Sequence, residues 1–237
     1  MKDTKALDQI GKLTSRFVRT CPSTPKYQER LAEEMEIILL LRFVDYFCQI
    51  RDILDLTTDI PHMTRGSAGS SLVCYLMGIT DVDPMQWDIP VARFLNPKRD
   101  DLPDVDIDYP HYRQEEVMNR IFKNWPGKSA RISNYVLYKD KSAKREAANK
   151  LKGKKKCISK HCGGILMFTR QLPKSLISQT NQILLDKNEV EDLEHLKVDI
   201  LANRGLSQLL EIDPTTKLYE YPEIDEATSS LLSRGDV

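Results

Sequence analysis

The segment Leu102–Tyr109 reads Leu-Pro-Asp-Val-Asp-Ile-Asp-Tyr, with an aspartate at every second position. Side chains alternate between the two faces of a strand, so Asp104, Asp106 and Asp108 would point the same way, with neighbours about 7 Å apart. Three like charges on one face repel each other and gain nothing from burial. The pattern therefore predicts a strand whose carboxylates hold divalent cations. Two Mg²⁺ ions about 4 Å apart, for which Mn²⁺ can substitute, drive in-line displacement at phosphorus in this way.

The composition bounds the class of protein. The chain has 237 residues, of which 41% are apolar and 30% charged, enough for a large domain with a real core. Its five cysteines form no CxxC pair, and Cys157 and Cys162 lack a second pair of zinc ligands, so the pattern favours a reduced, cytosolic protein. Apolar runs such as Ile37–Leu41 are too short to span a membrane, so no membrane partner is expected.

The overall neutrality hides a local asymmetry of charge. Residues 139–160 carry nine Lys and one Arg against two acids, a net charge of +8, whereas residues 186–226 carry twelve acids against four bases, a net charge of −8. A basic stretch of this kind can follow a phosphate backbone. It can equally be a solvated helix and loop, and charge alone does not choose between the two.

Hydrophobic spacing predicts alternating helices and strands. Residues 1–26 are interpreted as a linker or a short helix plus turn, and residues 27–55 as helical with a break near Leu41. Further helices are expected over 111–124, 141–152 and 223–233, and further strands over 163–168 and 196–201. This alternation predicts an α/β (α+β) fold, a mixed sheet flanked by helices.

A turn rich in glycine and serine, Thr64–Ser71, precedes an apolar segment. Ser67 is expected to cap a helix that stops at Gly78. The backbone N–H groups at such a helix start would form an anion site suited to a triphosphate. Small residues at a helix start also simply allow close packing, and this alternative stays open.

A lone acid, Asp199, interrupts the apolar segment Leu196–Leu201. A buried carboxylate requires a partner or a metal ion. We therefore expect Asp199 to complete a metal site with the alternating aspartates.

The order of these motifs resembles the palm of the family C bacterial replicative DNA polymerases, the alpha subunit of DNA polymerase III, in a truncated or split form. The resemblance covers roughly residues 25–237. The matching segments are Arg65–Val73, Gly78–Pro84, Arg93–Arg99, Pro103–Tyr109, Lys160–Ile165 and Lys197–Leu201.

The resemblance implies a fold similar to the polymerase beta-like nucleotidyltransferases, and it implies roles. Asp104, Asp106 and Asp199 look like the catalytic ligands of two Mg²⁺ ions, with Asp108 as a further ligand or a supporting group. Lys197 is placed near the site but is expected on the opposite side of the strand from Asp199. The expected nucleotide-binding residues are Arg65, Gly66, Ser67, Ser71 and Lys197. The expected nucleic-acid-binding residues are Lys98, Arg99, Lys141, Lys144, Arg145, Lys152, Lys154, Lys155 and Lys156.

The chain also departs from the family pattern. The resemblance leads us to expect an N-terminal extension over residues 1–26 and a palm-like domain over 27–237, with residues 131–160 as a reduced basic thumb. The phosphoesterase-like and fingers domains are expected to be absent. A partner chain would then supply the fingers and the C-terminal polymerase domains, in the cytoplasm of a bacterium or a phage-infected host.

Three functions remain open at this stage. The resemblance favours a DNA-directed DNA polymerase that joins a dNTP to the primer of a primer-template DNA. The chain is alternatively a non-catalytic module that keeps the palm fold within a replication complex, for which no metal-dependent stabilisation is expected. A free-standing nucleotidyltransferase would need no fingers, but the matches extend beyond the metal and glycine motifs.

Overall fold

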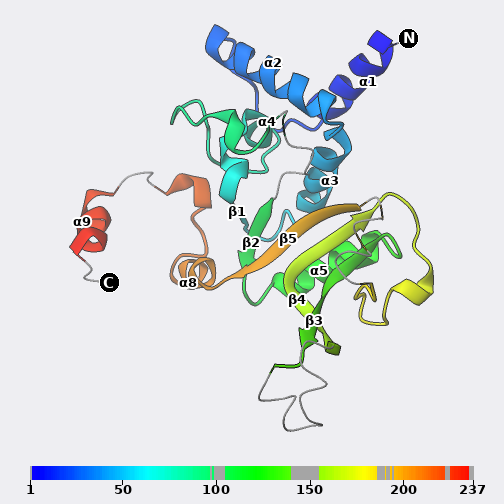
Figure 1. The fold of residues 1–237 in the computed structure, drawn as a ribbon. Helices are drawn as coiled ribbons and strands as arrows, with labels where there is room; N and C mark the ends of the chain where they lie inside the picture. Colours follow the sequence, from blue (N-terminus) through cyan, green and yellow to red (C-terminus); the bar gives the residue numbers. More distant parts are fainter. Residues whose placement is uncertain are drawn as a thin grey trace.

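A computed structural model describes residues 2–96, 98, 105–139, 155–185, 190, 193, 195–221 and 225–234. Its centre is a five-stranded sheet with the strand order β1-β2-β5-β4-β3 (Figure 1). The parallel pair is β2 with β5, and the other neighbours are antiparallel. The strands are β1 (Met63–Arg65), β2 (Asp106–Pro110), β3 (Ser129–Leu137), β4 (Lys155–Phe168) and β5 (His195–Asn203). The predicted mixed sheet flanked by helices is confirmed.

The helices divide into a group before the sheet and others between and after its strands. The α-helices are α1 (Lys2–Thr14), α2 (Pro25–Leu40), α3 (Val44–Asp55), α4 (Leu72–Leu76), α5 (Gln114–Asn124), α8 (Arg204–Ile212) and α9 (Glu226–Arg234). The short 3₁₀ helices are η1 (Gly66–Ser70), η2 (Val91–Arg93), η4 (Lys174–Leu176) and η5 (Leu218–Glu220). The expected break near Leu41 is confirmed, since Arg42 between α2 and α3 has a positive φ of 59°.

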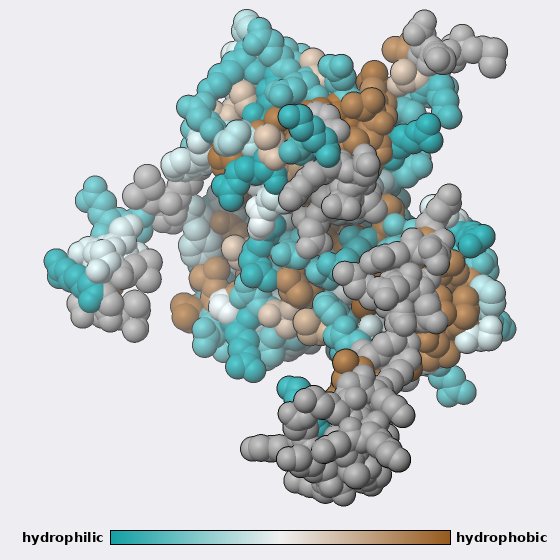
Figure 2. All heavy atoms as spheres, viewed as in Figure 1, coloured by the Kyte–Doolittle hydropathy of each residue, from teal (hydrophilic) through white to brown (hydrophobic). Residues whose placement is uncertain are grey.

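One face of the sheet forms the main core. Alternate strand residues such as Ile107, Val198 and Ile200 are completely or almost completely buried, together with residues of α3 and α5. The hydroxyl groups of Thr57 and Tyr109 are 2.8 Å apart within this core. On the face of the molecule seen in Figure 2, hydrophilic side chains predominate and hydrophobic ones reach the surface in separate patches.

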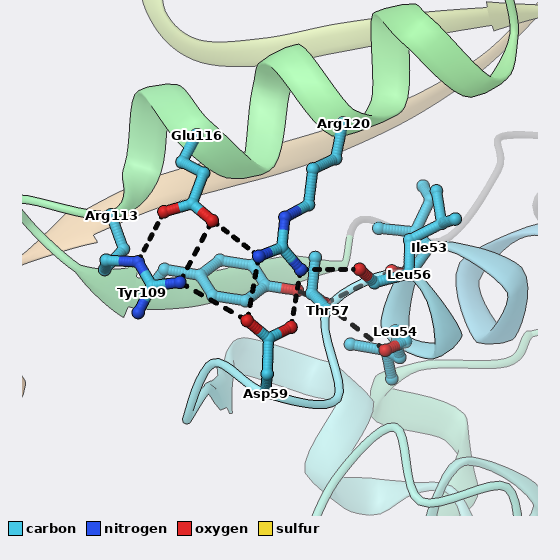
Figure 3. A network of polar contacts seen from close by, with 9 residues as sticks. All are labelled: Ile53, Leu54, Leu56, Thr57, Asp59, Tyr109, Arg113, Glu116 and Arg120. Carbon is cyan, nitrogen blue, oxygen red and sulfur yellow. Dashed lines mark hydrogen bonds and ion pairs between the residues drawn. The ribbon is translucent and has the colours of Figure 1, made fainter.

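A network of charged side chains joins α5 to the turn after α3 (Figure 3). Arg120 donates to Asp59 at 2.8 Å and to the backbone oxygen of Leu56 at 2.9 Å. Glu116 lies between Arg113 and Arg120 and accepts from both. The hydrogen bond from Arg120 lowers the pKa of Asp59 to about 2. The network therefore fixes α5, which packs against β3 and β5, to the turn that follows α3.

The N-terminal segment packs into the domain. Leu13 on α1 is fully buried, and the backbone N–H groups of Val18 and Arg19 both donate to the backbone oxygen of Leu76. Of the two interpretations of residues 1–26, the short helix plus turn is confirmed. The division of the chain at residue 26 remains a prediction. In the part of the chain that the structure describes, no helix has the length and apolar character needed to cross a bilayer.

Several element boundaries differ from expectation. The helix predicted from residue 111 begins at Gln114, and the strand predicted from Gly163 begins at Lys155, because β4 continues to pair with β3 beyond the point where it leaves β5. Local sequence patterns carry no signal for such an extension. The helix expected over 141–152 lies outside the described residues.

Candidate active site

Asp106 on β2 lies directly opposite Asp199 on β5 in the parallel register. Paired residues of neighbouring strands share a face and lie on backbones about 4.8 Å apart. Asp199 is only 9% exposed, and its backbone N–H donates to the backbone oxygen of Val105. The expected convergence of the lone acid with the alternating aspartates is therefore confirmed for Asp106. Asp104 lies outside the described residues.

On this face, the Oδ1 atoms of Asp108 and Asp199 are buried and accept no hydrogen bond from the described residues. Buried oxygens of this kind are costly unless a ligand satisfies them, and carboxylate oxygens are the donors that Mg²⁺ takes in proteins. Within the described ranges, no three His, Cys, Asp or Glu side chains are grouped closely enough to hold one ion. The donor chemistry fits a magnesium site built on Asp106 and Asp199, to which Asp104 would add a further ligand.

Lys197 shares the face of Asp199. Its ammonium group lies 2.8 Å from Oδ2 of Asp199. The expectation that Lys197 faces the other way is wrong, because it precedes Asp199 by two positions, and residues two apart on a strand point to the same side. The charge of Asp199 is thus balanced from within its own strand.

Asp108 has different surroundings from the other two acids. It is 1% exposed, and its Oδ2 forms an ion pair with Nε of Arg65 at 2.6 Å. The same oxygen accepts from Nδ2 of Asn203 at 2.8 Å. Sequence reasoning missed Asn203, and the one local signal is its position at the start of α8, where asparagine is a favoured cap.

The glycine turn lies beside Asp106. Gly66 has a φ of +77°, a conformation that glycine adopts without steric cost. A Cβ atom on Gly66 would lie 3.9 Å from Oδ2 of Asp106. The structure thus brings Gly66 to the acidic face, which is the face of the sheet that carries Asp106, Asp108 and Asp199. Nucleotide binding by Gly66 and Ser67 remains a prediction.

The helix that follows the turn begins later than expected. Ser67 does not cap an α-helix, because Gly66–Ser70 forms the 3₁₀ helix η1. The cap of α4 is Ser71, whose Oγ accepts from the backbone N–H of Cys74. Gly78 follows the helix with a φ of +65°, so the predicted stop is confirmed.

Glu34 on α2 occupies the start of α4. This carboxylate is fully buried and accepts from the backbone N–H groups of Leu72 and Val73 at 2.8 and 3.0 Å, and from the hydroxyl of Ser71 at 2.7 Å. Arg30 pairs with Glu34 at 2.6 Å. These N–H groups therefore bind a carboxylate of the protein itself, and the expected triphosphate site at this helix start is wrong. A direct contact between the buried Ser71 and a nucleotide does not fit this geometry either.

Sequence reasoning missed the Arg30–Glu34 pair. The available signal was an acid within the apolar stripe of α2, four residues after a base, a spacing that places the two on one helix face. Its connection to α4 depends on contacts between distant segments and has no local signature.

Two glycines on β4 leave room for the acidic face. A Cβ atom on Gly164 would lie 3.1 Å from Oδ1 of Asp199 and 2.5 Å from Ile132, and one on Gly163 would lie 2.6 Å from the backbone oxygen of Ile200. Nδ1 of His161 accepts the N–H of Gly164 at 2.7 Å, which places the proton of a neutral ring on Nε2. His161 therefore holds this glycine pair in place.

The basic residues are described only in part. Lys98 is exposed, and its backbone N–H donates to Asn96. Arg99, Lys141, Lys144, Arg145, Lys152 and Lys154 lie outside the described residues, and only the backbone of Lys155 and Lys156 is described. The N-terminal part of β4 pairs with β3 and has no register with β5, so the two strands continue as a hairpin beyond the sheet. The nucleic-acid contacts of these residues remain predictions.

The family model described as "Bacterial DNA polymerase III alpha NTPase domain" matches residues 11–152, more than half of the chain. The chain belongs to the DNA polymerase III alpha family. The match includes Gly66 and Asp106 and ends before Asp199, so the pairing of the two acids comes from the structure.

Several error-prone DNA polymerases are among the curated relatives of this chain. The protein of Bdellovibrio bacteriovorus is 34% identical over 137 residues, which are 56% of this chain and 13% of the relative. That of Nocardia farcinica is 37% identical over 132 residues, 54% of this chain and 12% of the relative. That of Mycobacterium tuberculosis is 36% identical over 132 residues, with the same two shares. The aligned part is thus 12–13% of the length of these relatives.

Proposed function

We propose that this domain is the catalytic palm of a family C DNA polymerase, which transfers a nucleotidyl group from a dNTP to the 3′-hydroxyl of a DNA primer. The observation that carries the proposal is the pairing of Asp106 with Asp199 across adjacent parallel strands, with one oxygen of Asp199 buried and unpartnered in the described structure. Two carboxylates so placed on one face form the core of a site for divalent cations.

The acids and bases of this face take different roles in the proposal. Asp104, Asp106 and Asp199 would hold two Mg²⁺ ions, or Mn²⁺ in their place. When bound, such ions activate the primer hydroxyl and neutralise the triphosphate. Arg65 and Lys197 keep 55% and 40% of their side chains exposed on the same face, so both have room to orient phosphate oxygens. Gly66 and Ser67 would bring the backbone close to the triphosphate.

The DNA would follow the basic residues. Lys98, Arg99 and the lysines of the segment between β3 and β4 are proposed to contact the phosphate backbone as a reduced thumb. Binding through such contacts falls steeply as salt rises, because each neutralised phosphate releases counterions. DNA binding that is weak and insensitive to salt would rule the thumb role out.

We propose that a partner chain carries the fingers and the C-terminal domains, as the resemblance to a split family C polymerase implies. The palm and its partner would assemble on a primer-template in the cytoplasm of a bacterium or a phage-infected host.

The metal site is tested on the chain alone by thermal unfolding at increasing Mn²⁺ concentration. The wild-type chain should be stabilised, because an ion that binds only the folded state raises its stability by mass action. Asp106→Asn should abolish this stabilisation without unfolding the domain. Asp88→Asn makes the same change at an exposed side chain paired with Lys26 and serves as the matched control.

Catalysis is tested by primer extension with the chain that carries the fingers added. Extension in Mg²⁺ or Mn²⁺ that Asp106→Ala abolishes supports the proposal. Absence of extension with either ion, in an assembly shown to form, contradicts it.

A second candidate, a palm-fold module that does not catalyse, is favoured by one observation. Asp199 and Asp108 are already balanced by the charges of Lys197 and Arg65, so the face is neutralised in part without a metal ion. This candidate predicts no Mn²⁺-dependent stabilisation of the wild-type chain, which the same titration measures.

A further inference from the structure

Asp108 is already neutralised on one oxygen. Its Oδ2 receives both the guanidinium of Arg65 and the amide of Asn203, at 2.6 and 2.8 Å. We infer that Asp108 is a positioning residue that holds Arg65 over the acidic face and is not a ligand of the metal ions. This inference rests on the proposed function, in which Arg65 orients the triphosphate.

The sheet brings Arg65 within reach of Asp108, and the ion pair between these two side chains is called the anchor below. On the antiparallel pair of β1 and β2, Arg65 lies opposite Asp106, and Met63 lies opposite Asp108. The side chain of Arg65 therefore crosses diagonally to reach Asp108, a distance that a long side chain spans. It is 55% exposed, while Asp108 is 1% exposed, so one end is fixed and the other is open. A guanidinium has five N–H donors, and a single carboxylate oxygen leaves several of them for phosphate oxygens.

Asn203 fixes the orientation of Asp108. Its Oδ1 accepts the backbone N–H of Leu206 at 2.9 Å and so caps α8, while its Nδ2 donates to Asp108. Because the cap determines which end of the amide points to Asp108, the position of Arg65 depends on the first turn of α8. The anchor thus connects β1, β2 and the start of α8.

The surroundings of Asp108 do not suit a hydrated ion. Mg²⁺ usually keeps several water molecules when it binds a protein, and a carboxylate that is 1% exposed offers no room for them. In the described part of the chain, Asp106, Asp108 and Asp199 do not form a three-ligand group that would hold one ion, although they share a face.

The inference is tested on the folded chain with Mn²⁺ alone and with a fluorescent dNTP in Mg²⁺. Asp108→Asn should keep the Mn²⁺ midpoint within about twofold of wild type, whereas Asp106→Asn should lose the stabilisation. The Kd of Asp108→Asn for the dNTP should rise about tenfold relative to wild type, the loss expected for one charge-assisted contact. Arg65→Ala should show the same rise, and the double variant should show no more. Asp88→Asn is the matched control for the change of charge.

The contact between Arg65 and Asp108 can also be measured directly, in the absence of any ligand. Hydrogen exchange of the Nε–H of Arg65, assigned from the signal that Arg65→Lys removes, should be slow in the wild type and fast in Asp108→Asn. Should Asp108→Asn fail to fold, Arg65→Lys replaces it. That variant changes an exposed side chain, and it should weaken dNTP binding without moving the Mn²⁺ midpoint.

The outcomes separate this inference from the proposed function. Loss of Mn²⁺ stabilisation in folded Asp108→Asn, equal to that in Asp106→Asn, overturns the inference, as does unchanged dNTP affinity together with unchanged Nε–H exchange. If the wild-type chain binds neither Mn²⁺ nor dNTP, the proposed function fails. Exchange at Arg65 then decides the anchor by itself: slow exchange that depends on Asp108 supports it, and fast exchange in the wild type overturns it.

Discussion

The carboxylate of Glu34 on α2 accepts the backbone N–H of Leu72, the first residue of α4, at 2.8 Å. Its neighbour Arg30 donates to the backbone oxygen of Ser70, the last residue of η1. One turn of α2 therefore holds the segment that joins the glycine turn to α4. The glycine turn beside Asp106 keeps its shape through a buried ion pair that lies outside the acidic face.

Replacement of Glu34 should destabilise the domain strongly. Glu34→Gln leaves Arg30 without its charged partner and weakens the hydrogen bonds from Ser71 and the start of α4. Breaking a buried pair from one side typically costs about 3–5 kcal/mol. Urea unfolding measures the loss, and Glu33→Gln, the same change at an exposed position one residue earlier, should stay within about 0.5 kcal/mol of wild type. A Glu34→Gln variant as stable as Glu33→Gln would contradict this role.

A methyl group at Gly164 should disturb the acidic face directly. Its Cβ would lie 2.5 Å from Ile132, 2.8 Å from His161 and 3.1 Å from Asp199, so at least one of these side chains must move. Gly164→Ala should therefore weaken Mn²⁺ stabilisation and also lower the melting temperature. Gly11→Ala is the control, because a Cβ atom there meets nothing within 4 Å and alanine favours a helix. Unchanged Mn²⁺ stabilisation in Gly164→Ala would show that the added methyl group displaces Ile132 or His161 and leaves Asp199 in place.

Removal of the charge of Lys197 should have opposite effects with and without metal. Lys197→Met leaves Asp199, whose side chain is 13% exposed, without its counter-charge, so the metal-free chain should melt at a lower temperature. The same loss removes a competitor of the metal ion, so the upward shift in melting temperature at a fixed Mn²⁺ concentration should grow. Differential scanning fluorimetry measures both. Lys26→Met, which breaks an exposed pair with Asp88, should change neither. A smaller Mn²⁺ shift in Lys197→Met would mean that the two cations do not compete for Asp199.

The pair of Asp59 with Arg120 should contribute stability above a defined pH. Folding lowers the pKa of Asp59 from 3.8 to about 2, so the folded state favours the ionised form. The contribution is therefore fully present above the unfolded pKa and is lost as the pH falls through the folded pKa. The difference in melting temperature between wild type and Asp59→Asn should stay constant from pH 7 to pH 5 and shrink below about pH 4. A difference that grows on acidification has the wrong sign for this pair.

Much of the fold follows from local patterns in the sequence. The helix break near Leu41, the stop at Gly78 and the strand around Asp199 are each predicted by hydrophobic spacing, glycine or a lone acid in an apolar run. These features are local because backbone dihedral preferences and side-chain periodicity act over a few residues. The start of α4 was placed too early, because the carboxylate that binds its first N–H groups comes from α2.

The sequence by itself determined that Asp106 and Asp108 share one face, since side chains on a strand repeat every two residues, and that Asp199 needs a partner. Tertiary structure alone decided that β5 pairs with β2 in the register that sets Asp199 beside Asp106. It also assigned Arg65 and Asn203 to Asp108, and Glu34 to the start of α4. These choices depend on which distant segments pack together, and the free energy of that packing is a property of the whole core that no single segment carries.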